Sequence, residues 1–191
     1  MGGGYFANAG VFLVDAIFSL LIYAVILRFL FQIIRADFYN PLSQAVVAVT
    51  NPALRPMRRL IPSLGGLDTA SLVLMILLQC ISTILIALMI GVKPEIAGVL
   101  VTALAELVSK FIYLYIFAII IQVILSWVAP GTYNPMTEIL FSITAPILGP
   151  ARRNIPPLGG LDFSPLVVII ALQLMLILLV APLRDLGRTL L

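Results

Sequence analysis

The stretch PMRRLIPSLGGLD at residues 56–68 returns 94 residues later as PARRNIPPLGGLD at residues 150–162. Around it, residues 39–79 and 133–173 are identical at 21 of 41 positions without a gap. So dense an ungapped match indicates a tandem duplication within the chain. We predict two repeats, residues 1–96 and 97–191, each ordered as a helix, a short amphipathic helix, the motif loop and a second helix.

Four apolar segments surround the two motif loops. The chain is 62% hydrophobic and only 10% charged, with a mean hydropathy of +1.20, far from the composition of soluble domains. A helix needs about 20 apolar residues to cross a hydrocarbon core of roughly 30 Å. The expected fold class is therefore all-α, a polytopic membrane protein with four transmembrane helices near residues 11–34, 69–90, 96–128 and 164–180, the last one closed by Pro182.

A ten-residue stretch precedes each motif loop, at residues 41–50 and 135–144, and is too short to span a membrane. Asn40 and Asn134 stand before a proline, which is the pattern of an N-cap followed by the first helical turn. We expect two short interfacial helices here. The prolines that follow are expected to prevent regular helix in the motif loops.

Two crossings return each repeat to its starting side, so the repeats should share one orientation, with both motif loops on one face. The motif side carries six basic residues, and the opposite side carries three, or four if Lys110 is counted there. The positive-inside rule then places the motif loops in the cytoplasm and both termini outside. The six are Arg35, Arg55, Arg58, Arg59, Arg152 and Arg153, and the three are Lys93, Arg184 and Arg188.

The ends of the motif have local structural explanations. The glycine pair permits the positive φ of a tight reversal. Asp68 and Asp162 stand directly before an apolar segment, where an N-cap carboxylate also meets the positive end of the helix dipole. We interpret both aspartates as caps.

The arginine pairs Arg58-Arg59 and Arg152-Arg153 admit two interpretations. In the first, they are topology determinants that reach toward anionic headgroups. In the second, the pseudo-twofold axis gathers four guanidinium groups, which pair with the two aspartates across the copies or form a site for an anion, a lipid headgroup or a partner. Both interpretations stay open at this point.

Four polar residues are expected at similar depth inside the membrane: Arg28, Gln79, Gln122 and Gln173. Polar groups in lipid usually face the bundle interior or a watery cavity, so this layer is a candidate path for an ion or solute. Alternatively, the glutamines bond between helices and Arg28 reaches toward the interface.

The composition excludes most catalytic chemistry. Without histidine and with only Cys80, the chain cannot form a Cys/His zinc site, an internal disulfide or a Ser/His/Asp triad. The acid/base candidates Asp68, Asp162 and Glu138 have structural explanations, so we expect no enzyme, metal or cofactor. A net charge of +3 is too small and too scattered for a nucleic-acid surface.

The two motif loops, together with Ser126-Trp127, resemble the YggT family of bacterial inner-membrane proteins, also called YlmG. The second copy is closer to the family pattern, because the first has Ser63 and Ala70-Ser71 where that pattern has a second proline and Ser-Pro. The resemblance implies the bacterial inner membrane. It also implies links to osmotic-stress tolerance, potassium uptake and envelope or division organisation, and in photosynthetic relatives to plastid nucleoid distribution and cytochrome assembly.

Two functional hypotheses follow. The first is a scaffold or assembly protein whose basic cytoplasmic loops bind anionic lipid headgroups or a membrane-protein partner. The alternative is a small channel or transport-accessory subunit that aids potassium or osmolyte movement, with a homo-oligomer supplying the pore.

Overall fold

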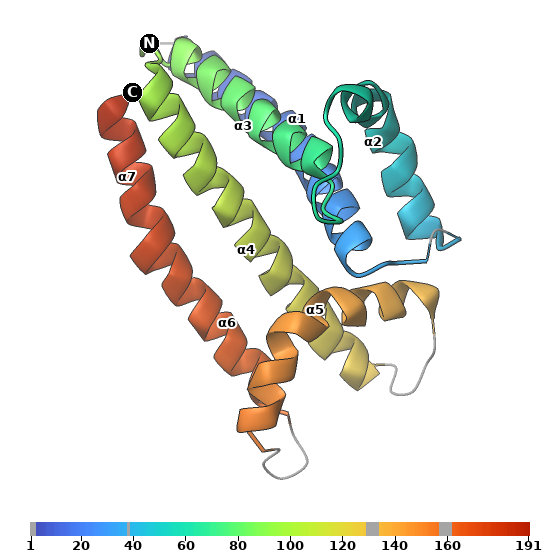
Figure 1. Cartoon of the computed structure of the whole chain (residues 1–191). Coiled ribbons are helices and arrows are strands. Elements are labelled where there is room, and N and C mark those ends of the chain that lie inside the picture. Colours follow the sequence, from blue (N-terminus) through green and yellow to red (C-terminus); the bar gives the residue numbers. More distant parts are fainter. Residues whose placement is uncertain (1–2, 38, 129–133, 157–161) are drawn as a thin grey trace.

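The computed structural model describes residues 3–37, 39–128, 134–156 and 162–191, and these are helical apart from turns and one isolated bridge. The order of elements in the first half recurs in the second (Figure 1). The predicted all-α class is confirmed. The helices are α1 (Gly3–Ile33), α2 (Pro41–Leu60), α3 (Thr69–Met89), α4 (Ile96–Val128), α5 (Pro135–Asn154), α6 (Ser164–Met175), the π-helical turn η1 (Leu176–Val180) and α7 (Ala181–Leu190).

Among the described residues, four helical rods have the length and hydropathy to cross a membrane: α1, α3, α4 and the continuous α6–η1–α7. The four predicted spans are therefore confirmed. Figure 1 shows both chain ends and the α3–α4 connection at one end of the bundle, while α2 and α5 lie toward the other end. The motif segments of both repeats therefore leave the same end of the bundle.

The fourth rod is longer than the sequence predicted. Helix was expected to end at Pro182, but it continues to Leu190. The wide turn η1 explains the difference: the Ala181 N–H bonds to the Leu176 carbonyl, one residue further back than in an α-helix. Pro182 follows in the first turn of α7, where the helix tolerates a residue without an N–H.

The helices α2 and α5 are also longer than expected, with 20 residues each instead of ten. Pro52 and Pro56 lie inside α2, and Pro146 and Pro150 lie inside α5. The prediction that the motif prolines prevent helix was wrong for Pro56 and Pro150. The four-residue spacing of the two prolines in each helix puts both on one face, so the missing hydrogen bonds bend the helix instead of ending it. The bend of α5 is plain in Figure 1.

The starts of α2 and α5 agree with the sequence prediction and also meet each other. The Asn40 side chain accepts a 2.9 Å bond from the Leu42 N–H, and Asn134 accepts an equal bond from the Met136 N–H. Both asparagines are therefore N-caps, as predicted. The amide nitrogen of Asn40 also donates to the Pro135 carbonyl at 2.6 Å, which joins the two repeats where their motif-side helices begin.

Each repeat has a hydrophobic cluster of its own. The first cluster joins α1, α2 and α3 and takes in Leu107 of α4 and two residues of α5, which packs both helices against the first repeat. The second joins α4, α5, α6 and η1. Central members are Ile22, Ile26, Leu54, Met75, Ile139 and Ile143 in the first cluster and Ala105, Ile119, Leu148, Leu172 and Val180 in the second.

The long rods α4 and α7 approach each other closely. A β-carbon at Gly187 would lie only 2.8 Å from the backbone nitrogen of Thr102, so the contact requires glycine. Below it, the Arg184 Nε donates to Glu106 at 2.6 Å, with both side chains 29% exposed. The residues after Pro182 thus extend the fourth rod and pack against α4, whereas the sequence predicted a short tail.

Candidate functional site

The motif loop of the first repeat contains a tight turn. Gly65 and Gly66 have φ of 61° and 83°, and the Leu67 N–H bonds to the Leu64 carbonyl at 3.0 Å. Two successive positive φ values are typical of a type I′ turn, which glycine adopts without strain. The predicted reversal is confirmed in this copy, whereas the matching residues 157–161 lie outside the described residues.

An arginine clamps each motif loop to the start of the following helix. In the first repeat, the Arg58 Nε lies 3.4 Å from Asp68 and its Nη2 bonds to the second carboxylate oxygen. In the second repeat, the Arg152 Nε donates to Asp162 at 2.8 Å. Both pairs form within one repeat, so the interpretation that they pair across the copies was wrong. The ten-residue separation lets each bent helix fold its arginine back onto its own loop.

Asp68 is the N-cap of α3, as predicted. It accepts bonds from the backbone N–H of Ser71 at 3.3 Å and from its hydroxyl at 2.6 Å. Burial acts to raise the pKa of Asp68, but the hydrogen bonds from Arg58 and Ser71 outweigh it and hold the pKa below its ordinary value.

Asp162 differs from its counterpart in position. It accepts a 2.9 Å bond from the Ser164 N–H, but α6 begins at Ser164, with Phe163 as the N-cap. The predicted cap role is therefore wrong by one residue. The Asp162 side chain nevertheless satisfies a backbone N–H at the start of the helix, because Ser164 is the first residue of α6. Burial acts to raise the Asp162 pKa, but bonds from Ser164 and Arg152 lower it below its ordinary value.

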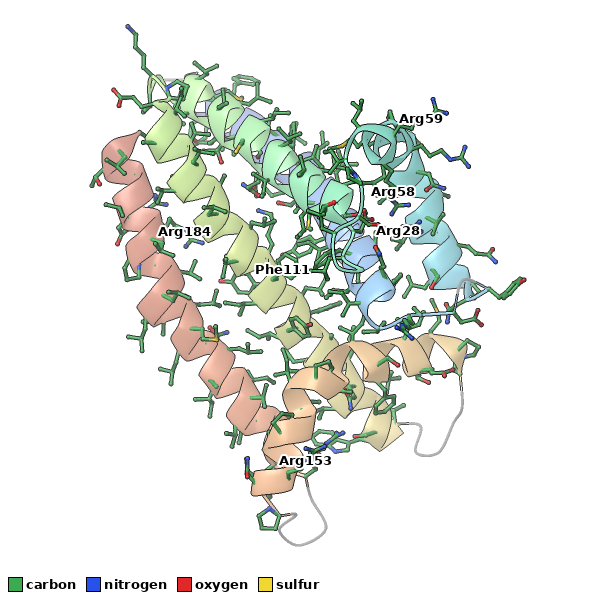
Figure 2. The ribbon with its side chains drawn as sticks, viewed as in Figure 1. Arg28, Arg58, Arg59, Phe111, Arg153 and Arg184 are labelled. Atoms are coloured by element: carbon green, nitrogen blue, oxygen red, sulfur yellow. The ribbon has the colours of Figure 1, made fainter. Side chains whose placement is uncertain are left out.

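A cavity of about 340 Å³ lies between α1, α2 and the first motif loop. Figure 2 shows Arg28 and Arg58 close together between α1 and α2, whereas Arg59 points away from them. We call this cavity the first-repeat cavity. The Gln32 amide closes one side by donating to the Gly66 carbonyl at 3.2 Å. Its walls are formed by Arg28, Phe31, Gln32, Ala36, Ser43, Val47, Arg58, Ile61, Ser63 and Asp68.

Two polar groups in the first-repeat cavity lack a partner within the described part of the chain. The Ser43 hydroxyl is buried, with the residue 1% exposed, and makes no hydrogen bond. Half-buried Arg28 bonds to none of the described residues, and the charges that act on it are those of Arg58 and Asp68. The sequence reasoning singled out Arg28 but missed Ser43, although Ser43 lies on the buried face of α2 with Val46 and Thr50.

The second repeat has a matching cavity of about 390 Å³ with different chemistry. Gln122, Phe141, Arg152 and Asp162 line it, at positions 94 residues after Arg28, Val47, Arg58 and Asp68. The Thr144 hydroxyl donates to the Gln122 side-chain oxygen, so that this amide is satisfied within the protein. The second cavity therefore contains one arginine and one aspartate, whereas the first contains a further, unpaired arginine.

Comparison with known proteins agrees with the duplicated architecture. The sequence model of the family described as CCB3/YggT matches twice, at residues 7–89 and 101–183. The chain belongs to the CCB3/YggT family. It is 46% identical over 169 residues to an uncharacterized Pseudomonas aeruginosa protein, a match that covers 87% of this chain and 86% of the relative.

Two further relatives of this YggT-family chain extend the match. A Vibrio alginolyticus protein named for the proC 3′ region is 39% identical over 169 residues, which cover 87% of this chain and 90% of the relative. The Escherichia coli K12 protein YggT is 37% identical over 168 residues, which cover 86% of each. No solved structure matches the chain.

The second arginine of each pair is exposed. Arg59 lies on the outer face of α2, and Arg153 lies near the end of α5, far from the first-repeat cavity in Figure 2. Arg55 is exposed one helical turn before Arg59. Across the described ranges, no carboxylate forms a salt bridge with any of these three arginines.

The four residues of the predicted intramembrane layer occupy different surroundings. Arg28 and Gln122 line separate cavities. Gln79 is buried in α3 with its side-chain oxygen unbonded, and Gln173 is exposed on α6. No hydrogen bond joins any two of them in the described structure.

A larger cavity of about 830 Å³ lies between the repeats, where α4 and α5 meet α1. Its lining is mostly aliphatic and aromatic and includes Tyr23, Leu27, Tyr113 and Met136. Among the described residues, no three acidic or cysteine side chains gather as a metal site. The arrangement therefore offers arginine-lined and apolar surfaces, which suit anionic and lipid ligands.

Proposed function

We propose that this YggT-family protein is a scaffold of the bacterial inner membrane whose helices α2 and α5 hold anionic lipid headgroups. The motif loops face the cytoplasm in this proposal, and both termini face the opposite side. The excess of arginine on the motif side supports this orientation.

One observation carries the proposal: the two arginines of each motif have different partners. Arg58 and Arg152 are used by the clamps, so the conformation of the loop accounts for them. Arg59 and Arg153 are exposed and form no salt bridge within the described residues, yet both copies have arginine there. An external anion supplies the partner that the fold does not, and a basic side chain near an anionic membrane surface contributes about 1 kcal/mol.

The lipids that surround the protein test this proposal. Wild type and the R59Q/R153Q double variant are reconstituted into mixed phosphatidylcholine and phosphatidylglycerol vesicles and extracted in native nanodiscs, whose lipids are then quantified. We expect wild type to enrich phosphatidylglycerol and the double variant to lose most of that enrichment.

The matched control is Arg188→Gln, which removes an exposed arginine from α7 at the opposite end of the bundle. Its lipid ratio should equal that of wild type. Equal enrichment in wild type and R59Q/R153Q would reject headgroup binding by these arginines. Crosslinking of the same variants in native membranes then shows whether a protein partner occupies this surface.

The scaffold is better supported than the channel alternative. A path within one protomer needs Arg28, Gln79, Gln122 and Gln173 to line one route, but the first and third line separate cavities and Gln173 is exposed. A homo-oligomeric pore would conduct potassium through purified protein in liposomes. We expect no such flux.

A further inference from the structure

We propose that the first-repeat cavity binds one phosphate group through Arg28, Arg58 and the hydroxyl of Ser43. The inference rests on the proposed function for its ligand class, because anionic headgroups are the phosphates that the surface arginines would concentrate. It goes further in naming a single saturable site made of residues other than the exposed arginines.

The unused hydrogen-bond donors define the ligand. Asp68 accepts hydrogen bonds from the Nε and Nη2 of Arg58. The N–H groups of Arg58 Nη1 are therefore available to a ligand. The Arg28 guanidinium forms no hydrogen bond with the described residues, although it is half-buried beside this pair. Ser43 adds a hydroxyl without a partner in the described structure. A ligand with several acceptor oxygens would satisfy all three groups, and a phosphate group has that form.

The charge balance selects an anion. Arg28 and Arg58 bring two positive charges to the cavity, and Asp68 brings one negative charge. That carboxylate acts on both arginines but has a single charge, so the two arginines and Asp68 leave the cavity with a net positive charge. An unpaired charge away from water is costly, whereas arginine bound to phosphate gains charge-assisted and often bidentate hydrogen bonds.

The size and place of the cavity fit one phosphate ester. Its volume of about 340 Å³ is at the lower end of the range for ligand pockets, roughly 300–1,000 Å³. Arg28 lies five residues before Ile33, the last residue of α1, or roughly 7.5 Å along the helix axis. This level is within reach of a lipid phosphate at the interface and of a phosphate ester from water.

The second repeat explains why one site is expected and not two. Gln122 stands where the first repeat has Arg28, and the Thr144 hydroxyl already satisfies its oxygen. The cavity around Gln122 contains only the paired Arg152 and Asp162 as charged groups among its described lining. It has no uncompensated positive charge to attract an anion.

A titration of the full-length protein in detergent micelles tests the proposal. Dihexanoyl phosphatidic acid and inorganic phosphate are titrated separately into wild type, R28Q, S43A and R59Q, with dihexanoyl phosphatidylcholine as the zwitterionic reference. R28Q copies the residue of the second repeat, S43A is a smaller change for which folding is not in question, and R59Q removes an arginine outside the cavity. Size-exclusion profiles confirm that each variant is folded.

We expect saturable binding to wild type, a loss of about tenfold or more in R28Q and a several-fold loss in S43A, with R59Q within a factor of two of wild type. Binding of both anions identifies a free phosphate site, and binding of phosphatidic acid alone identifies a headgroup site. Unchanged affinity in both R28Q and S43A, or no saturable binding of either anion, would overturn the inference. The lipid enrichment of R59Q/R153Q is a separate readout, so the two proposals fail independently.

Discussion

The two repeats fold the same motif into surroundings of different polarity. In the first, the Asp68 side chain is 5% exposed and Arg58 is 37% exposed, whereas Asp162 and Arg152 are 41% and 45% exposed. The clamp is common to both repeats, but the second cavity has Gln122 where the first has Arg28. The duplicated residues therefore hold the loop, and a position that differs sets the charge of the cavity.

The repeats also differ in the length of their last helix. In the first, α3 ends at Met89, and the glycine that follows, Gly91, has a φ of 79°. In the second, the turn η1 carries the helix on to Leu190, where α7 packs closely on α4. This difference gives the second repeat a helix contact that the first repeat cannot form.

The largest expected difference between the repeats concerns their clamps. Asp68→Ala removes a buried carboxylate that binds Arg58 and caps α3, so we expect a loss of about 2–4 kcal/mol in the free energy of unfolding. Asp162→Ala breaks an exposed pair and should cost below about 1 kcal/mol. Unfolding of both variants by denaturant in detergent measures the difference, and equal losses would contradict unequal burial of the clamps.

The α4–α7 contact of the second repeat gives the next largest effect. Gly187→Ala places a β-carbon against the Thr102 backbone and should destabilise the protein by about 1–3 kcal/mol. Gly149→Ala is the matched control in α5, because nothing lies within 4 Å of its β-carbon position. Since alanine favours helix, this variant should be neutral or more stable by up to about 1 kcal/mol. Thermal unfolding should separate the two variants in opposite directions.

A smaller effect is expected at the threonines that occupy matching positions in α2 and α5. Thr144→Val removes the donor to the Gln122 oxygen and leaves that buried acceptor unpaired, at a cost of about 1–2 kcal/mol. The Thr50 hydroxyl bonds only to the Val46 carbonyl of its own helix at 2.7 Å, so Thr50→Val should cost less. A larger loss from Thr50→Val in denaturant unfolding would show that the Gln122 bond contributes little.

The clamps should also give stability an acid dependence. The pKa values of Asp68 and Asp162 lie below the unfolded value near 3.8. Their stabilisation is therefore complete above that value and is lost as the pH falls through the folded pKa. Unfolding measured between neutral pH and about pH 3 should show declining stability at the acid end. Asp68→Asn should flatten this decline more than Asp162→Asn does, and an unchanged acid profile in both variants would contradict the role of the clamps.

The sequence predicted the membrane architecture because hydrophobic length and internal repetition are properties of the chain itself. Four apolar runs located the spans, and the glycine pair located the turn of the first loop. The asparagine-proline pairs located both N-caps. Proline was harder to interpret, because its effect depends on register. Pro52 and Pro56 lie on the same face of α2 and bend the helix without ending it. Pro182 follows a π-helical turn, and the helix continues through it.

Fewer features of the candidate site than of the fold could be predicted from the sequence. The motif identified Arg58 and Asp68, but their pairing within one repeat depends on the length and bend of α2, which local patterns did not reveal. Arg28 was recognised as unusual, yet only the packing of α1 on α2 places it beside Arg58 and Ser43. The internal alignment already matches Gln122 with Arg28. The effect of this difference on the charge of the two cavities becomes clear only from the residues that line them.

The number of phosphate-bearing lipids bound per chain shows whether the first-repeat cavity, and not its counterpart in the second repeat, is the cationic site. Native mass spectrometry of the full-length protein with dihexanoyl phosphatidic acid counts them. We expect one saturably bound molecule in wild type, beside weaker non-saturable binding at the exposed arginines, and a loss of about tenfold or more in the occupancy of that site in R28Q. Two bound molecules, or one that persists in R28Q, would show that the repeats are equivalent or that the site lies elsewhere.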